Sequence, residues 1–233
     1  MRHRPVGVSV CPVPHIPALL VIDMQNALVA IAHQGARTVA RIAALQERAR
    51  AAGVPVVTVQ HQDDELEPGT EGWRIAPALA PAPGEPVVPK SSPDSFLDTG
   101  LDATLRDMGV TEVVVTGFAT EICVESTARR ALSLRYDVVL VADAHTTSLR
   151  PGPDSDSGPY AAPEASIAHH NEIYRNLRFP GRRIRVLRTA EVDFTAGPAG
   201  PAGTARVAGT ADTADTADTV GAATGRPAGS TAG

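Results

Sequence analysis

Cys123 is the side chain whose type and position most clearly suggest chemistry. The β-branched run of residues 113–115 is typical of a strand buried on both faces, and Gly117 interrupts it. From Cys123 onward, small and apolar residues recur at helical spacing: Val124, Thr127, Ala128, Ala131 and Leu132. Cys123 is therefore predicted at a helix N-terminus, where unpaired amides and the helix dipole favour the nucleophilic thiolate and lower the thiol pKa. An inert buried cysteine is the alternative.

Two charged side chains are predicted to lie near this cysteine. Asp23 follows the apolar run 18–22, which predicts a central strand, and Lys90 ends the run 87–90, which predicts a short edge strand. The carboxyl ends of parallel strands form one edge of a sheet, where ligands bind in open α/β folds. We therefore expect Asp23, Lys90 and Cys123 at that edge. A turn aspartate and a solvated surface lysine are the alternatives for the first two.

The remaining hydrophobic patterns predict the elements that position these residues. Further strands are expected at 54–59, 137–141 and 184–187, and helices at 36–52, 101–108, from 123 and at 164–177. The order strand, helix, strand near the start of the chain implies a right-handed βαβ unit with parallel strands. The chain is thus predicted to form a three-layer αβα domain with a six-stranded, mostly parallel sheet over residues 17–194.

The composition fits one globular domain with irregular ends. A chain of 233 residues and 24.2 kDa with 43% apolar residues can bury a full core. Prolines punctuate residues 1–16, which are predicted to be irregular. Residues 195–233 are rich in Ala, Gly, Thr and Asp, a composition that predicts a disordered tail.

Neither nucleic acid nor a membrane is expected as a partner. Aromatic residues make up only 3% of the chain, the net charge is -5 and the pI is near 5.8, so a broad basic, base-stacking face is not expected. No apolar run approaches the roughly 18 residues of a membrane helix, and prolines interrupt the N-terminal apolar stretch, which makes a poor signal peptide. The two cysteines, Cys11 and Cys123, fit a reduced, cytoplasmic protein better than a disulfide.

Three segments resemble the isochorismatase-like cysteine hydrolase superfamily, which includes nicotinamidases, carbamoylsarcosine amidases and streptothricin hydrolases. They are A-L-L-V-I-D-M-Q-N at residues 18–26, the segment around Lys90, and T-G-F-A-T-E-I-C-V-E-S-T-A-R-R-A at residues 116–131. The resemblance covers nearly all of the predicted domain. It implies a Rossmann-like αβα fold and a hydrolase site in which Asp23, Lys90 and Cys123 form a catalytic triad.

The resemblance also implies a role for each of these residues. Asp23 would be the general base for the Cys123 thiol and later an acid for the leaving amine, and Lys90 would stabilise negative charge on both. The backbone amides of Ala119 and Cys123 would hold the oxyanion, where one donor typically contributes 10²–10³ in rate. The peptide bond between Phe118 and Ala119 would be cis.

Three residues are candidates for substrate contacts. Gln25 stands beside the proposed base and could orient an amide, or cap the following helix. Trp73 lies in the polar loop 60–86, which is expected to shape the pocket, and could line the pocket or anchor this loop as a hydrophobic plug. Phe118 precedes the oxyanion amide. A second loop, 150–163, is also expected to shape the pocket.

The sequence departs from the nicotinamidase pattern at the metal site. Nicotinamidases have an aspartate two residues before a histidine, whereas the matching positions here are Val59 and His61. No metal and no cofactor are therefore expected, and a contribution of His61 to a residual metal or substrate site is left open. Isochorismatases proper lack the cysteine, so Cys123 favours hydrolysis of an amide, ureido or lactam C–N bond through a thioester. Opening of a streptothricin-type lactam is one specific candidate.

Other functions remain open from the sequence. An isochorismatase-type hydrolase of secondary metabolism is the enzymatic alternative, and a catalytically idle interaction protein of the same fold is the other. A redox sensor is less favoured, because no resolving cysteine lies near Cys123. By family analogy the chain is expected to form a homo-oligomer, a dimer or a tetramer, with Trp73, Phe96 and Leu97 as candidate contact residues.

Overall fold

The computed structural model describes residues 15–148 and 162–195, and the strands within these ranges form one parallel sheet. They lie in the order β3-β2-β1-β4-β5-β6, and each neighbouring pair runs parallel. Their bounds are Pro17–Ile22 (β1), Val56–His61 (β2), Val87–Lys90 (β3), Glu112–Phe118 (β4), Asp137–Thr146 (β5) and Ile184–Leu187 (β6). The predicted six-stranded α/β fold is confirmed, with a sheet that is wholly parallel.

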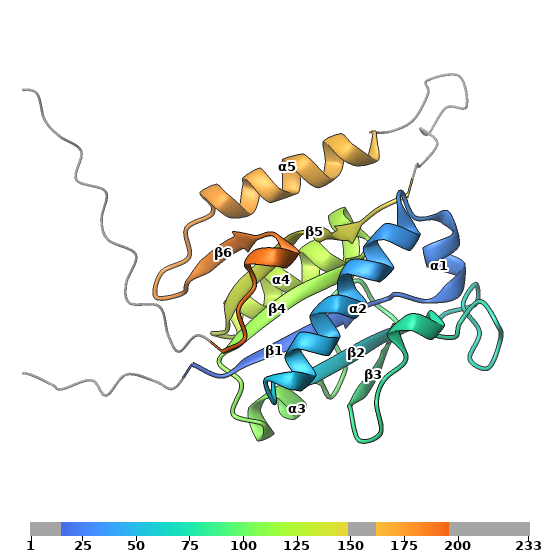
Figure 1. Ribbon diagram of the computed structural model, residues 1–233, viewed down its shortest axis with the longest axis horizontal. Helices are drawn as coiled ribbons and strands as arrows, with labels where there is room; N and C mark the ends of the chain where they lie inside the picture. The colour runs from blue at the N-terminus through green and yellow to red at the C-terminus, as the bar shows by residue number, and fades with distance from the viewer. Residues whose placement is uncertain (1–14, 149–161, 196–233) are drawn as a thin grey trace, which may run out of the picture. The chain divides into compact units, whose positions relative to one another are not determined.

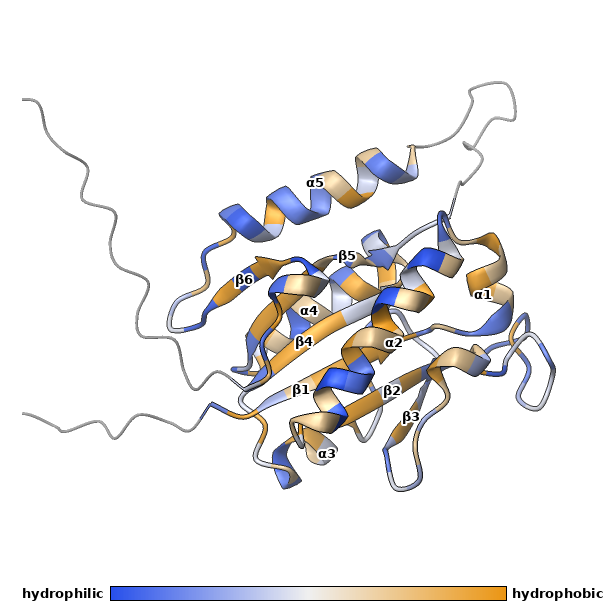
Figure 2. Ribbon diagram, in the orientation of Figure 1, coloured by the Kyte–Doolittle hydropathy of each residue, from blue (hydrophilic) through white to orange (hydrophobic). Residues whose placement is uncertain are grey.

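Helices cover both faces of this sheet (Figure 1). Helix α2, Gly35–Ala51, packs on one face, while α3, Leu101–Asp107, α4, Glu125–Ser133, and α5, Pro163–Asn176, pack on the other. Successive side chains of β1 point to opposite faces of the sheet, so they belong to two hydrophobic cores. Leu20 and Ile22 pack in the core under α3, α4 and α5, whereas Leu19 and Val21 pack in the core under α2. Figure 2 shows the apolar strands between helices whose outward residues are largely hydrophilic.

Several element boundaries differ from the prediction. Strand β2 starts after Pro55, which has no N–H for the ladder, and continues to His61, while β5 extends to Thr146. A short helix that was not predicted, α1, spans Asn26–Ile31. The helix expected to begin at Cys123 is preceded by a π-helical turn, Thr120–Val124, so that Cys123 lies inside this turn rather than at the first residue of α4.

Gly117 does not end β4, as the sequence suggested: β4 stays paired with β1 up to Gly117 itself, opposite Ile22, and continues to Phe118, which pairs with β5. The Gly117 φ of 122° is rarely adopted by residues with a side chain, and a Cβ at this position would lie 2.0 Å from the carbonyl oxygen of Ile22. Glycine therefore permits the close approach of these two strands at their carboxyl ends.

The strand order reverses between β1 and β4, which makes this the switch point of the sheet. In such sheets a crevice opens outside the carboxyl ends of the strands at the switch point, and ligands bind there. Among the described residues, no helix is long and apolar enough to span a membrane. Most of the predicted irregular segment 1–16, which includes Cys11, lies outside the described residues, as do most of the loop 150–163 and the tail after residue 195.

Candidate active site

The Lys90 ammonium joins the other two residues of the predicted site. Its Nζ lies 2.7 Å from Asp23 Oδ2 and 3.4 Å from Cys123 Sγ. The Lys90 side chain is 0% exposed and that of Asp23 is 2% exposed. The structure thus brings together all three residues, which are separated by 67 and 33 positions along the chain (90 minus 23, 123 minus 90).

Each of the three side chains comes from the carboxyl end of a strand. Asp23 follows β1 directly and has a φ of 53°, a left-handed conformation that aspartate tolerates better than most residues. Lys90 is the last residue of β3, the edge strand. Cys123 lies in the π-helical turn after β4. The parallel sheet therefore aligns residues that the chain presents at three separate strand ends.

Burial dominates the electrostatics of the pair formed by Asp23 and Cys123. It raises the pKa of the Asp23 carboxyl above its ordinary value, and Lys90 opposes this rise. Burial, together with the nearby Asp23 carboxylate, raises the pKa of the Cys123 thiol to about 12, although Lys90 again acts in the opposite direction. The expectation of a lowered thiol pKa was therefore wrong, because desolvation and the Asp23 carboxylate outweigh the effect of the lysine.

These shifts define what the resting site can do. The thiol holds its proton and needs a base before it can act as a nucleophile. Asp23 Oδ1 is buried, and it has no hydrogen-bond partner in the part of the chain that the structure describes. A carboxylate with a raised pKa and a free oxygen atom beside the thiol can accept that proton.

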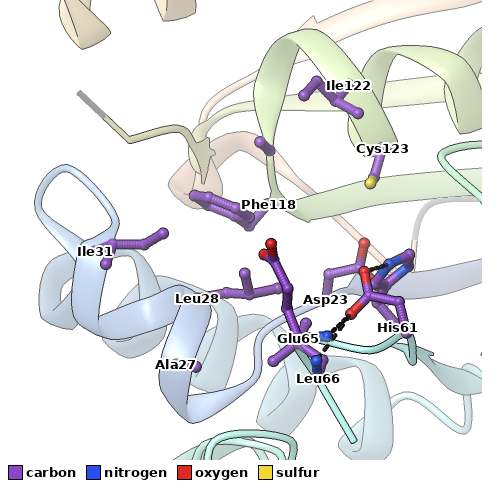
Figure 3. A pocket seen from close by; sticks show the side chains of 12 residues that line it. Asp23, Ala27, Leu28, Ile31, His61, Glu65, Leu66, Phe118, Ile122 and Cys123 are labelled. Carbon is purple, nitrogen blue, oxygen red and sulfur yellow. Dashed lines mark hydrogen bonds and ion pairs between the residues drawn. The ribbon is translucent and has the colours of Figure 1, made fainter. Parts of the chain in front are cut away.

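A pocket of about 610 Å³ opens above these groups, a volume typical of small-molecule sites. Its lining combines the reactive groups with an apolar wall and an acidic rim. The lining residues are Asp23, Ala27, Leu28, Ile31, His61, Asp63, Glu65, Leu66, Phe118, Ala119, Ile122 and Cys123. Figure 3 shows Leu28, Ile31 and Phe118 on the side of the pocket away from His61. The pocket can thus hold a small, partly apolar molecule against the thiol.

The turn that carries Cys123 also lines this pocket. The peptide bond between Phe118 and Ala119 is cis. The carbonyl oxygen of Ala119 accepts hydrogen bonds from the amides of Ile122 and Val124, at 3.0 and 3.1 Å. Ala119 and Cys123, whose amides were predicted to hold an oxyanion, both lie at the pocket wall.

Gln25 and Trp73, two of the candidates for substrate contacts, are not among the residues that line this pocket. Gln25 is 0% exposed, and its Nε2 donates to the carbonyl oxygens of His61 and Trp73, each at 2.9 Å. Its Oε1 accepts the backbone N–H of His61, also at 2.9 Å. The amide of Gln25 is fully used in holding the end of β2 and the following loop. Of the three candidates, only Phe118 reaches the pocket.

Seven pocket residues were not singled out from the sequence, among them Leu28, Ile31, Asp63 and Glu65. Leu28 and Ile31 belong to α1, and their i, i+3 spacing was a weak signal for that helix. Asp63 and Glu65 come from the loop that was expected to shape the pocket. Their position near His61 in sequence was a signal, but only the fold shows which of the acidic residues in this loop turn inward.

The donor set does not fit the metal site of nicotinamidases. Val59 offers only carbon where that pattern has a carboxylate. Both ring nitrogens of His61 are engaged, with Nδ1 3.1 Å from Lys90 Nζ and Nε2 2.9 Å from Asp63 Oδ2. His61 therefore belongs to the hydrogen-bond network of Lys90.

Comparisons with known proteins identify the family of the chain. The family model for the isochorismatase domain matches residues 17–154. A streptothricin hydrolase of Streptomyces noursei is 40% identical over 195 residues, which cover 78% of this chain and 66% of that protein. The chain thus spans slightly less than two thirds of the length of this curated relative.

The names of two further similar proteins describe enzymes that act on amides. A ureidoacrylate amidohydrolase of Variovorax paradoxus is 36% identical over 169 residues, 54% of this chain and 67% of that protein. The solved structure of an N-carbamoylsarcosine amidase from Thermoplasma acidophilum aligns with a TM-score of 0.61 at 27% identity, over 76% of this chain and 99% of that one. The chain belongs to the isochorismatase family, among the isochorismatase-like cysteine hydrolases.

Proposed function

We propose that this protein hydrolyses a C–N bond of a small amide, ureido compound or lactam, with Cys123 as the nucleophile. The observation that carries this proposal is the position of the Lys90 ammonium, 2.7 Å from Asp23 and 3.4 Å from Cys123 at the base of the pocket. A thiol, a carboxylate and a buried cation in this arrangement supply a nucleophile, a base and a positive charge at one point.

In the first half of the reaction, Asp23 accepts the thiol proton as the sulfur attacks the carbonyl carbon. A C–S bond forms, and the carbonyl oxygen becomes an oxyanion that the amides of Ala119 and Cys123 stabilise. The C–N bond then breaks, and the leaving nitrogen takes the proton from Asp23. Lys90 remains charged throughout and limits the cost of negative charge on the carboxylate and the sulfur.

In the second half, water hydrolyses the thioester. Asp23 accepts a proton from the water as its oxygen attacks the thioester carbon. The C–S bond then breaks and the Cys123 sulfur is protonated again, which regenerates the resting state. The high thiol pKa favours this return, because it stabilises the protonated form of the resting cysteine. No step requires a metal or a cofactor.

The pocket supports a small substrate rather than a polymer, since its volume of about 610 Å³ suits a ligand of this size. The similarity to streptothricin hydrolase makes a streptothricin-type lactam the first specific candidate. Ureidoacrylate and N-carbamoylsarcosine follow from the other two relatives.

The test is release of ammonia or amine, or lactam opening, from a panel of these three compounds and simple amides after exhaustive chelation. Wild type, Cys123→Ala and Asp23→Asn are compared, and intact-protein mass spectrometry is used to detect an acyl group on Cys123. Turnover by the wild type and none by Cys123→Ala is expected. Turnover that persists in Cys123→Ala would show that the nucleophile is wrong, and silence across the panel with no acyl-enzyme would favour the idle interaction protein.

We also propose that the protein is cytoplasmic and forms a homo-oligomer, through exposed apolar side chains. Ile31, Val87 and Leu97 are 59%, 45% and 50% exposed. Phe96, by contrast, was wrongly expected at a contact surface, since it is buried and stacks on Tyr136. Sedimentation analysis of the wild type measures the oligomeric state directly.

A further inference from the structure

His61 lies between the ammonium of Lys90 and a carboxylate that the proposed mechanism does not use. It is the last residue of β2, whose neighbours in the sheet are β1, which Asp23 follows directly, and β3, which ends at Lys90. Its ring therefore stands beside the reactive groups and also lines the pocket (Figure 3).

The two contacts of the ring determine where its proton lies. Nδ1 is 3.1 Å from Lys90 Nζ, which has only donors to offer, so Nδ1 must be the acceptor. Nε2 is 2.9 Å from Asp63 Oδ2, so Nε2 carries the proton and donates it. His61 is therefore neutral and protonated on Nε2.

Asp63 is itself held in the orientation that this contact requires. Its second oxygen, Oδ1, accepts the backbone N–H groups of Glu65 and Leu66, at 2.9 and 2.8 Å. The hydrogen bond with His61 lowers the pKa of the Asp63 carboxyl, and the two backbone bonds act in the same direction. Asp63 thus stays ionised and selects the tautomer of His61.

The backbone of His61 is fixed as well. The Gln25 amide bonds to both its N–H and its carbonyl oxygen, each at 2.9 Å. The ring therefore cannot move away from Lys90 without breaking bonds on both sides.

A neutral acceptor suits the Lys90 ammonium. The flexible four-carbon chain of lysine needs contacts on several sides to hold its head group in one place. Ser92 supplies a carbonyl oxygen at 3.0 Å, Asp23 the carboxylate at 2.7 Å and Cys123 the sulfur at 3.4 Å. The ring nitrogen of His61, at 3.1 Å, is a further acceptor for the ammonium. Since the imidazole carries no negative charge, it orients the ammonium without neutralising the charge that acts on Asp23 and Cys123.

We infer that His61, with its tautomer set by Asp63, is a positioning residue that holds Lys90 between Asp23 and Cys123. The inference rests on the proposed function for its effect on turnover, but its effect on the Cys123 thiol is independent of any substrate. It assigns His61 to the lysine network rather than to a metal site.

The experiment compares His61→Ala, His61→Asn and the control His169→Ala, which removes an exposed histidine from α5. The Asn side chain can place an amide oxygen near the position of Nδ1. Turnover of the best panel substrate gives kcat and KM, and alkylation by iodoacetamide at one fixed pH gives the reactivity of Cys123. Thermal melting reports the folded fraction of each variant.

His61→Ala should lower kcat by roughly 10- to 100-fold, the range for loss of a hydrogen bond to a charged group, with little change in KM. It should also slow alkylation, because a mobile Lys90 stabilises the thiolate less. His61→Asn should recover part of both losses, and His169→Ala should match the wild type. Asp63→Ala, at an exposed position, should shift both readouts in the same direction and serves if His61→Ala fails to fold.

Wild-type kcat and alkylation in folded His61→Ala would overturn the inference, as would equal losses in the Ala and Asn variants. If Cys123-dependent turnover is unaffected by His61→Ala, the positioning role fails while the proposed function stands. If the wild type turns over nothing but alkylation still depends on His61, the proposed function fails while the positioning role stands.

Discussion

Replacing Lys90 with methionine should strongly destabilise the protein, because it leaves the Asp23 carboxylate buried without its counter-ion. The two side chains are 0% and 2% exposed and 2.7 Å apart. Removing one partner of a buried ion pair typically costs about 3–5 kcal/mol. For a domain of this size, a loss of that order lowers the melting temperature by roughly 6–20 °C.

The loss should depend on pH with a definite sign. Burial already raises the pKa of Asp23 above its ordinary value of 3.8, and Lys90 is the largest opposing influence, so the variant raises this pKa further. At pH values between the Asp23 pKa of the folded wild type and the higher Asp23 pKa of the folded variant, Asp23 is protonated in the variant but not in the wild type. The stability difference should therefore grow by about 1.4 kcal/mol per pH unit across that window and level off above it.

Urea denaturation of both proteins at a series of pH values measures this difference. Taking the variant minus the wild type cancels the groups that titrate equally in both. Lys90 is the only lysine in the sequence, so the control is Arg37→Met, an exposed cation on α2 that should change stability by no more than about 0.5 kcal/mol. A loss in Lys90→Met below about 1 kcal/mol, or one that is the same at every pH, would refute the reasoning.

Three further predictions concern the thiol, a glycine and a buried histidine. The rate of Cys123 alkylation should still rise above pH 9.0, since the pKa of the thiol is about 12. Asp23→Asn removes a negative charge beside the thiol, so it should speed alkylation at a given pH while turnover is lost. A wild-type alkylation profile with its midpoint below pH 9.0 would contradict the raised thiol pKa. Gly117→Ala should lower the free energy of unfolding, measured by urea denaturation, by at least about 2 kcal/mol more than Gly84→Ala does. Both glycines have a positive φ, but only at Gly117 would a Cβ lie 2.0 Å from a carbonyl oxygen of β1. Burial lowers the pKa of His145 from 6.5 to about 4, so the unfolded state binds a proton first and stability should fall as pH drops through this range, by up to about 1.4 kcal/mol per unit. His145→Gln should flatten this slope, and an unchanged slope would assign it to other groups.

The pattern of apolar runs was enough to predict the sheet and the three residues at its carboxyl edge. A short apolar run such as 18–22, which follows Pro17 and ends before Asp23, favours a strand buried on both faces, and the structure has one there. Because parallel strands end at a common edge, the polar residues that follow them meet there whatever the intervening loops do. Asp23, Lys90 and Cys123 could therefore be grouped from the pattern of strands alone.

Tertiary structure alone decided how these groups behave. The pKa of a thiol depends on burial and on neighbouring charges from other strands, and at Cys123 these raise it although the sequence predicted a helix N-terminus that would lower it. Helix α1 has only six residues and no side-chain cap, so contacts from other segments must support it. One of these is the hydrogen bond that the backbone N–H of Asn26 donates to the carbonyl oxygen of Arg74. The same holds for Gln25 and His61, whose partners come from loops and strands distant in sequence, and no local pattern encodes which of their polar atoms remain available.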